Sequence, residues 1–186
     1  MIIAFGHRKQ VGKSSAANLL NHHIIIENGK DSVVNTSFAA PLYHVCHYLY
    51  SWAGFLPKKH YDEFGEDKEI VLPELGKTPR QILIELGTEA IRGMIYEHTW
   101  VDYMIKNRDP ARITIISDLR FPDEFAAIKD ADGYCIRIDR PDVPETNDPA
   151  DVALADCEDW DFTIVNQGSM RELNDAVVDI YETIKP

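Results

Sequence analysis

The chain has 186 residues, of which 45% are apolar and 27% charged, a composition ordinary for one globular domain with or without a small inserted cap. Its formal net charge of −12 disfavours nucleic acids and anionic membranes as partners, although a local cluster of Arg and Lys can still bind a small anion. We expect no signal peptide, and three cysteines without CxxC spacing indicate reduced thiols in a cytosol.

Hydrophobic spacing and helix-start signals predict elements of both types in the first part of the chain. Thr78-Pro79, for example, is typical of a helix N-terminus, with Thr as cap and Pro in the first turn. We expect strands at 2–5 and 32–38, helices at 14–26, 41–53, 78–96 and 100–106, and a mobile excursion rich in Pro, Gly and charge at 56–77.

The second part of the chain continues the alternation, beginning with a β-branched run typical of a central parallel strand. We expect strands at 112–117, 134–139 and 162–165, helices at 122–131 and 170–184, and an acidic loop or lid at 140–159. Strands that alternate with helices imply an α/β fold with a parallel sheet covered on both faces.

A Gly-Lys-Ser segment lies between the first strand and the first helix, where a phosphate loop would have to sit. Gly12 would let the backbone approach the phosphates, Lys13 would reach the β- and γ-phosphates, and Ser14 would ligate Mg²⁺. The pattern GxxxxGK[ST] requires its first Gly at position 7, but that residue is His7 and Gly6 comes one residue earlier. A helix cap without any phosphate is the alternative.

A second carboxylate, Asp118, follows the apolar run 113–116. Phosphoryl-transfer enzymes hold Mg²⁺ with such a carboxylate at the end of a neighbouring strand. The alternative is that Asp118 caps the helix that begins at Pro122 or turns the chain.

These features, together with three further segments, resemble the deoxynucleoside monophosphate kinases of tailed bacteriophages. The matching segments run in order along nearly the whole chain: RKQVGKSSAA at 8–17, SFAAPL at 37–42, TPRQIL with LGTE and Arg92 at 78–92, ISDLRFPDE at 116–124, and IVNQG with Leu173 at 164–173. His7 and the segment after Arg140 depart from the family pattern.

The resemblance implies a P-loop NTPase fold of the nucleoside monophosphate kinase type, with three layers and five parallel strands in the order 2-3-1-4-5. It implies one domain over 1–186, with an acceptor-binding helical excursion at about 40–108 and a lid-like segment at about 140–160. The expected reaction is phosphoryl transfer from ATP, with Mg²⁺, to a deoxynucleoside monophosphate for phage DNA synthesis in the host cytoplasm. We expect a small nucleotide as partner, no nucleic acid and no membrane, and a homodimer stays open.

The resemblance also implies roles for residues at motif positions. The expected catalytic residues are Lys13, Asp118, Arg120 and Arg140, and the expected metal ligands are Ser14 and Asp118. The expected ATP-binding residues are His7, Arg8, Lys9, Gly12, Lys13, Ser14, Ser15 and Asn166, and the expected acceptor-binding residues are Phe38, Arg80, Glu89, Arg92, Trp100 and Arg120.

Several alternatives stay open at this point. Each arginine is also a candidate for a structural ion pair with one of the many acids, and Arg137 points either into the site or to solvent. Phe38 and Trp100 are candidates for stacking on a base, but packing in a core is the default for aromatic side chains. The alternatives to a deoxynucleoside monophosphate kinase are a kinase for another small acceptor, such as dephospho-coenzyme A, gluconate or shikimate, and an ATP-binding scaffold without catalysis.

Overall fold

A computed structural model describes residues 1–144, 147 and 149–185. The chain divides into two compact units, of which unit 1 comprises Met1–Phe38 with Met104–Pro186, and unit 2 comprises Ala39–Tyr103. Among the described residues, no helix is both long and apolar enough to span a bilayer.

Unit 1 contains a five-stranded sheet in which every pair of neighbours is parallel. Its strands are β1 (Ile2–Gly6), β2 (Val33–Thr36), β3 (Ile113–Leu119), β4 (Tyr134–Asp139) and β5 (Phe162–Val165). Their order in the sheet is β2-β3-β1-β4-β5. The predicted α/β class and strand order are therefore confirmed.

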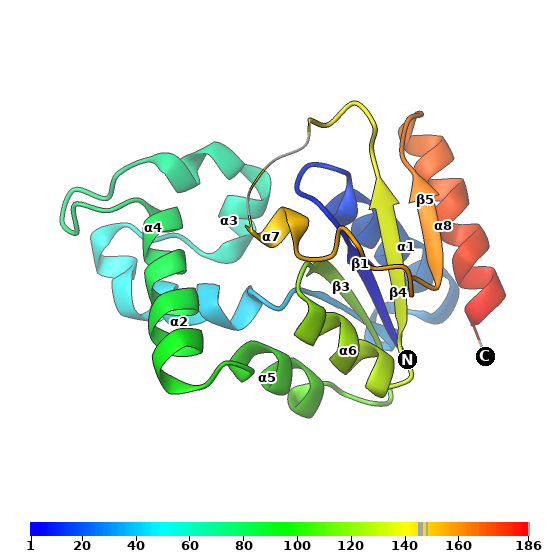
Figure 1. Cartoon of the computed structure of the whole chain (residues 1–186), viewed down its shortest axis with the longest axis horizontal. Coiled ribbons are helices and arrows are strands. Elements are labelled where there is room, and N and C mark those ends of the chain that lie inside the picture. The colour runs from blue at the N-terminus through cyan, green and yellow to red at the C-terminus, as the bar shows by residue number, and fades with distance from the viewer. Residues whose placement is uncertain (145–146, 148, 186) are drawn as a thin grey trace. The chain divides into compact units, whose positions relative to one another are not determined.

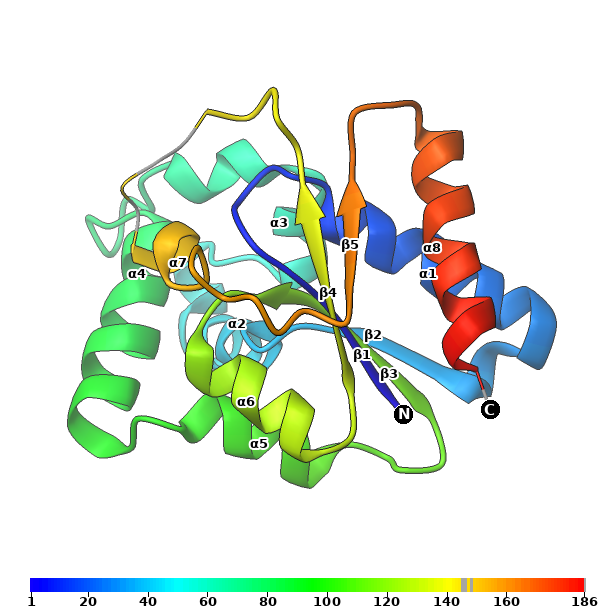
Figure 2. The ribbon, with the colours of Figure 1, turned by 45° about the vertical axis from the view of Figure 1, so that its right-hand side comes forward.

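Helices cover both faces of this sheet, with α1 and α8 on one face and α6 on the other (Figures 1 and 2). The helical elements that belong to unit 1 are α1 (Lys13–Asn28), η1 (Lys30–Ser32), α6 (Pro122–Asp130), α7 (Pro149–Val152) and α8 (Met170–Ile184), and α5 (Thr99–Asn107) contains the boundary between the units. Positions 145, 146 and 148 of the expected lid lie outside the described residues.

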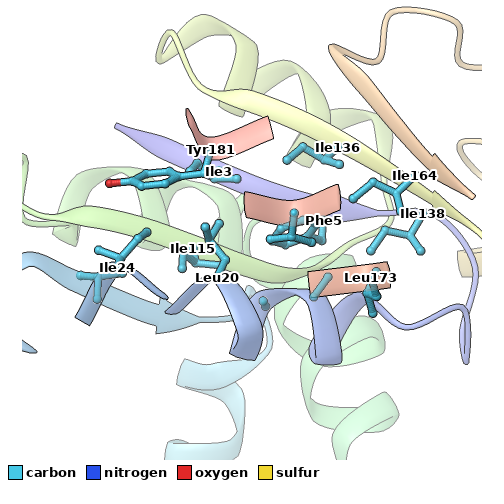
Figure 3. Packing of buried hydrophobic residues seen from close by; sticks show 14 of the residues in the cluster. Ile3, Phe5, Leu20, Ile24, Ile115, Ile136, Ile138, Ile164, Leu173 and Tyr181 are labelled. Atoms are coloured by element: carbon cyan, nitrogen blue, oxygen red, sulfur yellow. The ribbon is translucent and has the colours of Figure 1, made fainter. Parts of the chain in front are cut away.

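The main core of unit 1 lies between the sheet and the helices α1 and α8 (Figure 3). β1 is the central strand and all five of its residues are buried, which explains its continuous apolar sequence. Phe5 and Ile115 from the strands pack in one cluster with Leu20 from α1 and Tyr181 from α8. Each such side chain contributes roughly 1.5–3 kcal/mol when fully buried.

The ladder between β1 and β3 is irregular just before both strands end. Ala4 pairs with Ile116, but Gly6 pairs with Leu119, so β3 uses one more residue than β1 over this step. Bulges of this kind redirect side chains at the ends of strands. Asp118 lies in the extra step, inside β3 and not after it as the sequence predicts.

Unit 2 is helical and has a core of its own. Its elements are α2 (Ala40–Tyr50), η2 (Ser51–Ala53), α3 (Lys58–Glu63), η3 (Gly65–Glu69), α4 (Pro79–Ile84) and η4 (Glu85–Ile95). The segment 56–77, expected to be a mobile excursion, contains α3 and η3 and contributes buried Tyr61 and Leu72 to this core. Aromatic packing of Tyr61 on Phe55, with ring centroids 5.4 Å apart, explains the order despite the polar composition.

The helix predicted from Thr78 begins as expected and then changes type. The Thr78 hydroxyl accepts the N–H of Gln81 while the Gln81 side chain accepts the N–H of Thr78, which completes a capping box. From Glu85 to Ile95 the helix has π geometry. Such wide turns are rare and are frequent at functional sites, and no residue pattern in the sequence distinguishes them from an α-helix.

Candidate phosphate-binding site

The loop from His7 to Gly12 joins the central strand β1 to the N-terminus of α1. His7 and Gln10 have positive φ angles of 93° and 64°, and Gly12 has a φ of 109°. Positive φ is costly for residues other than Gly, so the surrounding structure must impose this path. The first turn of a helix leaves N–H groups without partners inside the helix, and these groups and the helix dipole favour a bound anion.

Asn166, which directly follows β5, stabilises this loop by a hydrogen bond. Its Nδ2 donates to the carbonyl of Val11 at 2.8 Å. A Cβ atom on Gly12 would lie 2.5 Å from the same Nδ2, so Gly12 is required both by its φ angle and by this close approach. Asn166, expected to bind ATP, thus shapes the loop directly.

Lys13 is the first residue of α1 and is buried at the centre of the site. Its Nζ donates to the carbonyl of His7 at 2.7 Å and to the carbonyl of Arg8. Burial and, after it, the positive charge of Arg120 lower the pKa of Lys13 to about 7, although Asp151 and Asp118 oppose the shift. A bound anion would stabilise the charged ammonium of Lys13 and so raise its pKa again.

His7 is buried beside a carboxylate of the neighbouring strand. Its Nδ1 lies 2.7 Å from Oδ1 of Asp139. Nε of Arg137 donates to Oδ1 of Asp139 at 3.0 Å and to Oδ2 at 2.9 Å. Burial, followed by the charge of Arg137, lowers the pKa of His7 although Asp139 raises it. Burial therefore favours the neutral imidazole, and Arg137 is a member of this network.

A cavity of about 520 Å³ opens beside the loop, at the carboxyl ends of β1 and β4. Open α/β sheets bind their ligands at this edge. Its lining includes His7, Arg8, Arg137, Asp139 and Asp151. The cavity therefore combines both signs of charge.

Asp118 and Ser14 supply oxygen atoms near the loop. The Oδ1 of Asp118 accepts the N–H of Phe38 at 2.7 Å, which joins the bulge of β3 to the end of unit 1's first segment. Ser14 is exposed and Ser15 half-buried in the first turn of α1. Because Mg²⁺ prefers oxygen ligands, the donor types of Ser14 and Asp118 fit the ion.

Glu124 caps the N-terminus of α6. The buried Oε2 of Glu124 accepts the N–H groups of Arg120 at 2.8 Å and Phe121 at 3.1 Å. Burial, followed by the negative charge of Asp118, raises the pKa of Glu124 to about 8. Sequence reasoning assigned no role to Glu124, although the residue lies in the segment 116–124, which carries part of the family resemblance.

Arg120 and Lys9 converge on Asp151, a buried carboxylate of α7. The N–H of Lys9 donates to Oδ1 of Asp151 at 2.8 Å, and Nη1 of Arg120 lies 3.7 Å from the same oxygen. No pattern in the segment 140–160 distinguishes Asp151 from the other acids there, so sequence reasoning missed it.

The remaining predicted site residues are distributed over both units. In unit 1, Phe38 is buried and Arg140 is exposed. In unit 2, exposed Arg80 pairs through Nε with Glu69, and η4 carries exposed Glu89 and half-buried Arg92.

Trp100 packs against the core of unit 2 and donates from Nε1 to the carbonyl of Gly87 at 3.2 Å. Lys13, Asp118 and Arg120 all belong to unit 1. The charges of Arg120 and Asp118 both influence the pKa of Lys13, which indicates that the three side chains lie near one another. Arg80, Glu89, Arg92 and Trp100 belong to the other unit.

Comparison with known proteins gives one informative relative. No protein-family model matches the chain. A protein of Acanthamoeba polyphaga mimivirus, named "Putative deoxynucleotide monophosphate kinase", is 29% identical over 191 residues. The alignment covers 91% of this chain and 90% of the relative, so the similarity extends over both units and nearly the full length of each protein.

Proposed function

We propose that the chain is an ATP-dependent kinase that phosphorylates a deoxynucleoside monophosphate, producing the diphosphate and ADP. The observation that carries the proposal is the burial of Lys13. This residue is the first of α1 and follows the loop that leaves the central strand. A cation is costly to bury, and here a bound phosphate chain would supply the counter-charge. The mimivirus relative, named for this reaction, supports the choice of acceptor.

The donor types around the loop fit ATP with Mg²⁺. Backbone N–H groups at the start of α1 suit phosphate oxygens, and His7, Arg8, Lys9 and Ser15 lie along the same stretch. Ser14 and Asp118 would hold Mg²⁺, which supplies charge neutralisation on the phosphate oxygens when bound. Asn166 keeps the loop in its path through the bond to Val11.

The protein's own charges would then act on the transferring group. Lys13 and Arg120 offset negative charge that spreads over the equatorial oxygens, and Arg140 is the further cation we assign to this task. Phosphoryl transfer depends mainly on positioning and electrostatic stabilisation, so no covalent enzyme intermediate is required.

Acceptor recognition is assigned to cationic, aromatic and carboxylate side chains. Arg80, Arg92 and Arg120 would bind the acceptor phosphate, since guanidinium groups pair with phosphate in a bidentate manner. Glu89, Phe38 and Trp100 would contribute to the fit of the nucleoside. In the phage setting implied by the sequence resemblance, such a product would feed DNA synthesis.

The test is a panel of acceptors. The protein is incubated with ATP and Mg²⁺ and with each deoxynucleoside monophosphate, each ribonucleoside monophosphate, dephospho-coenzyme A or gluconate, and ADP release is followed. We expect turnover with at least one deoxynucleoside monophosphate, with dGMP and dTMP the first to test. Turnover only with a non-nucleotide acceptor would contradict the proposed acceptor but would still support kinase activity. Binding of ATP without turnover of any acceptor would favour a scaffold.

A further inference from the structure

Asp151 lies in an unusual electrostatic position for an acidic residue. Its side chain is fully buried, although it belongs to the short helix α7 in the segment that follows β4 (Figures 1 and 2). It accepts the N–H of Lys9 at 2.8 Å and lies 3.7 Å from both the Lys9 ammonium and the Arg120 guanidinium. A backbone N–H of the phosphate loop and two cations thus surround one carboxylate.

These donors are the ones that a phosphate oxygen would use. Backbone N–H groups of such loops and guanidinium groups both bind phosphate as well as carboxylate. The carboxylate therefore supplies counter-charge to cations that a phosphate chain would otherwise neutralise.

A phosphate chain that used the same donors would have to compete with the Asp151 carboxylate for them. Two anions that share a buried site repel one another strongly, because little water is present to screen them. Asp151 also lines the 520 Å³ cavity together with Val152 and Ala155 of the same segment, so space is available on its side of the loop.

We propose that Asp151 is an internal competitor for the phosphate loop, whose carboxylate occupies an oxyanion position there and leaves it when a phosphate chain binds. This inference rests on the proposed function insofar as ATP is the ligand that displaces it. The cost of displacement lowers the apparent affinity for phosphate chains, as for any site whose competent state is only partly populated.

The experiment measures dissociation constants by calorimetry at fixed ionic strength for ATP, inorganic tripolyphosphate and adenosine. Asp151→Asn removes the charge and keeps the shape, Asp151→Glu keeps the charge, and Asp156→Asn removes an exposed acid of the same segment. We expect Asp151→Asn to bind ATP and tripolyphosphate at least about fivefold more tightly than wild type, as removal of a competing state predicts. Adenosine binding should not change, and the other two variants should resemble wild type.

Unchanged or weaker tripolyphosphate binding by a folded Asp151→Asn variant would overturn the proposal. Should that variant fail to fold, hydrogen exchange of the wild-type protein decides. Tripolyphosphate should speed exchange of the amides at 150–155 if Asp151 is released, whereas slower or unchanged exchange there contradicts release.

The binding experiment separates this inference from the proposed function. If Asp151→Asn tightens tripolyphosphate binding but no acceptor is phosphorylated, the competitor role of Asp151 is supported and the proposed kinase activity is contradicted. If acceptors are phosphorylated but the variant gains no affinity, the kinase activity is supported and the competitor role is contradicted. If neither protein binds ATP or tripolyphosphate, both fail.

Discussion

At the scale of single residues, Lys13 shows the sharpest conflict between burial and charge. Its ammonium is bonded to two loop carbonyls, yet burial lowers its pKa to about 7. The free protein therefore carries Lys13 in both protonation states near neutral pH. An anion binds the charged state, so binding must be linked to proton uptake.

This linkage sets the direction of a pH effect on ATP affinity. As pH rises from about 7.5 to about 9, the neutral form of Lys13 predominates in the free protein and ATP affinity should fall, by at most about tenfold per pH unit. Lys13→Arg keeps its charge throughout this range, so its affinity should vary much less. Calorimetric titration with ATP at saturating Mg²⁺ measures both profiles. Equal slopes for the two proteins would rule out Lys13 as the titrating group.

At the scale of elements, the start of α6 depends on a buried carboxylate. Glu124 holds two N–H groups at the turn between β3 and α6, and the turn carries Arg120. Burial and the neighbouring Asp118 raise the pKa of Glu124 to about 8. Between the ordinary pKa of a Glu side chain and about pH 8, Glu124 is therefore protonated in the folded protein and ionised in the unfolded chain.

Because the folded-state pKa is the higher one, stability should fall as pH rises from about 5 to about 8. The slope from one such group is at most about 1.4 kcal/mol per pH unit. Glu124→Gln removes the titration and should flatten the profile, whereas Asp130→Asn, an exposed acid of the same helix, should not. Urea unfolding at several pH values gives the free energies. A profile that Glu124→Gln leaves unchanged would assign the pH dependence to other groups.

At the scale of the whole molecule, the chain has two compact units, each with a core of its own. Phe5 and Leu20 belong to the core of unit 1, whereas Phe55 and Tyr61 belong to that of unit 2. The phosphate loop lies in unit 1 and Arg80 in unit 2. Donor and acceptor binding are therefore expected to respond to different substitutions.

Arg80→Ala should raise the KM for the deoxynucleoside monophosphate more than about tenfold and leave the KM for ATP nearly unchanged, since a lost phosphate contact costs about 1.5–3 kcal/mol. Steady-state kinetics with each substrate varied in turn measures the two constants. Arg171→Ala is the matched control, because Arg171 is exposed and pairs with Asp175 on α8. A rise confined to ATP would place Arg80 on the donor side.

The sequence alone determined the α/β frame of the molecule and the position of the loop between its first strand and its first helix. β-Branched runs such as 113–116 and the helix spacing of 14–26 predict local structure because burial of one face depends on periodicity. Gly12-Lys13-Ser14 stands out because a strand, a glycine-containing loop and a helix start follow one another directly. The order of the strands was available only through the family resemblance.

Only the tertiary structure decided the partners of the buried charges. Asp151 meets Lys9 across 142 positions of sequence, and no spacing rule predicts such a contact. The aromatic cluster around Tyr61 likewise ordered a segment whose composition suggests mobility. Burial, pKa and charge pairing depend on neighbours that folding brings together from distant parts of the chain, whereas helix and strand patterns depend on neighbours a few residues away.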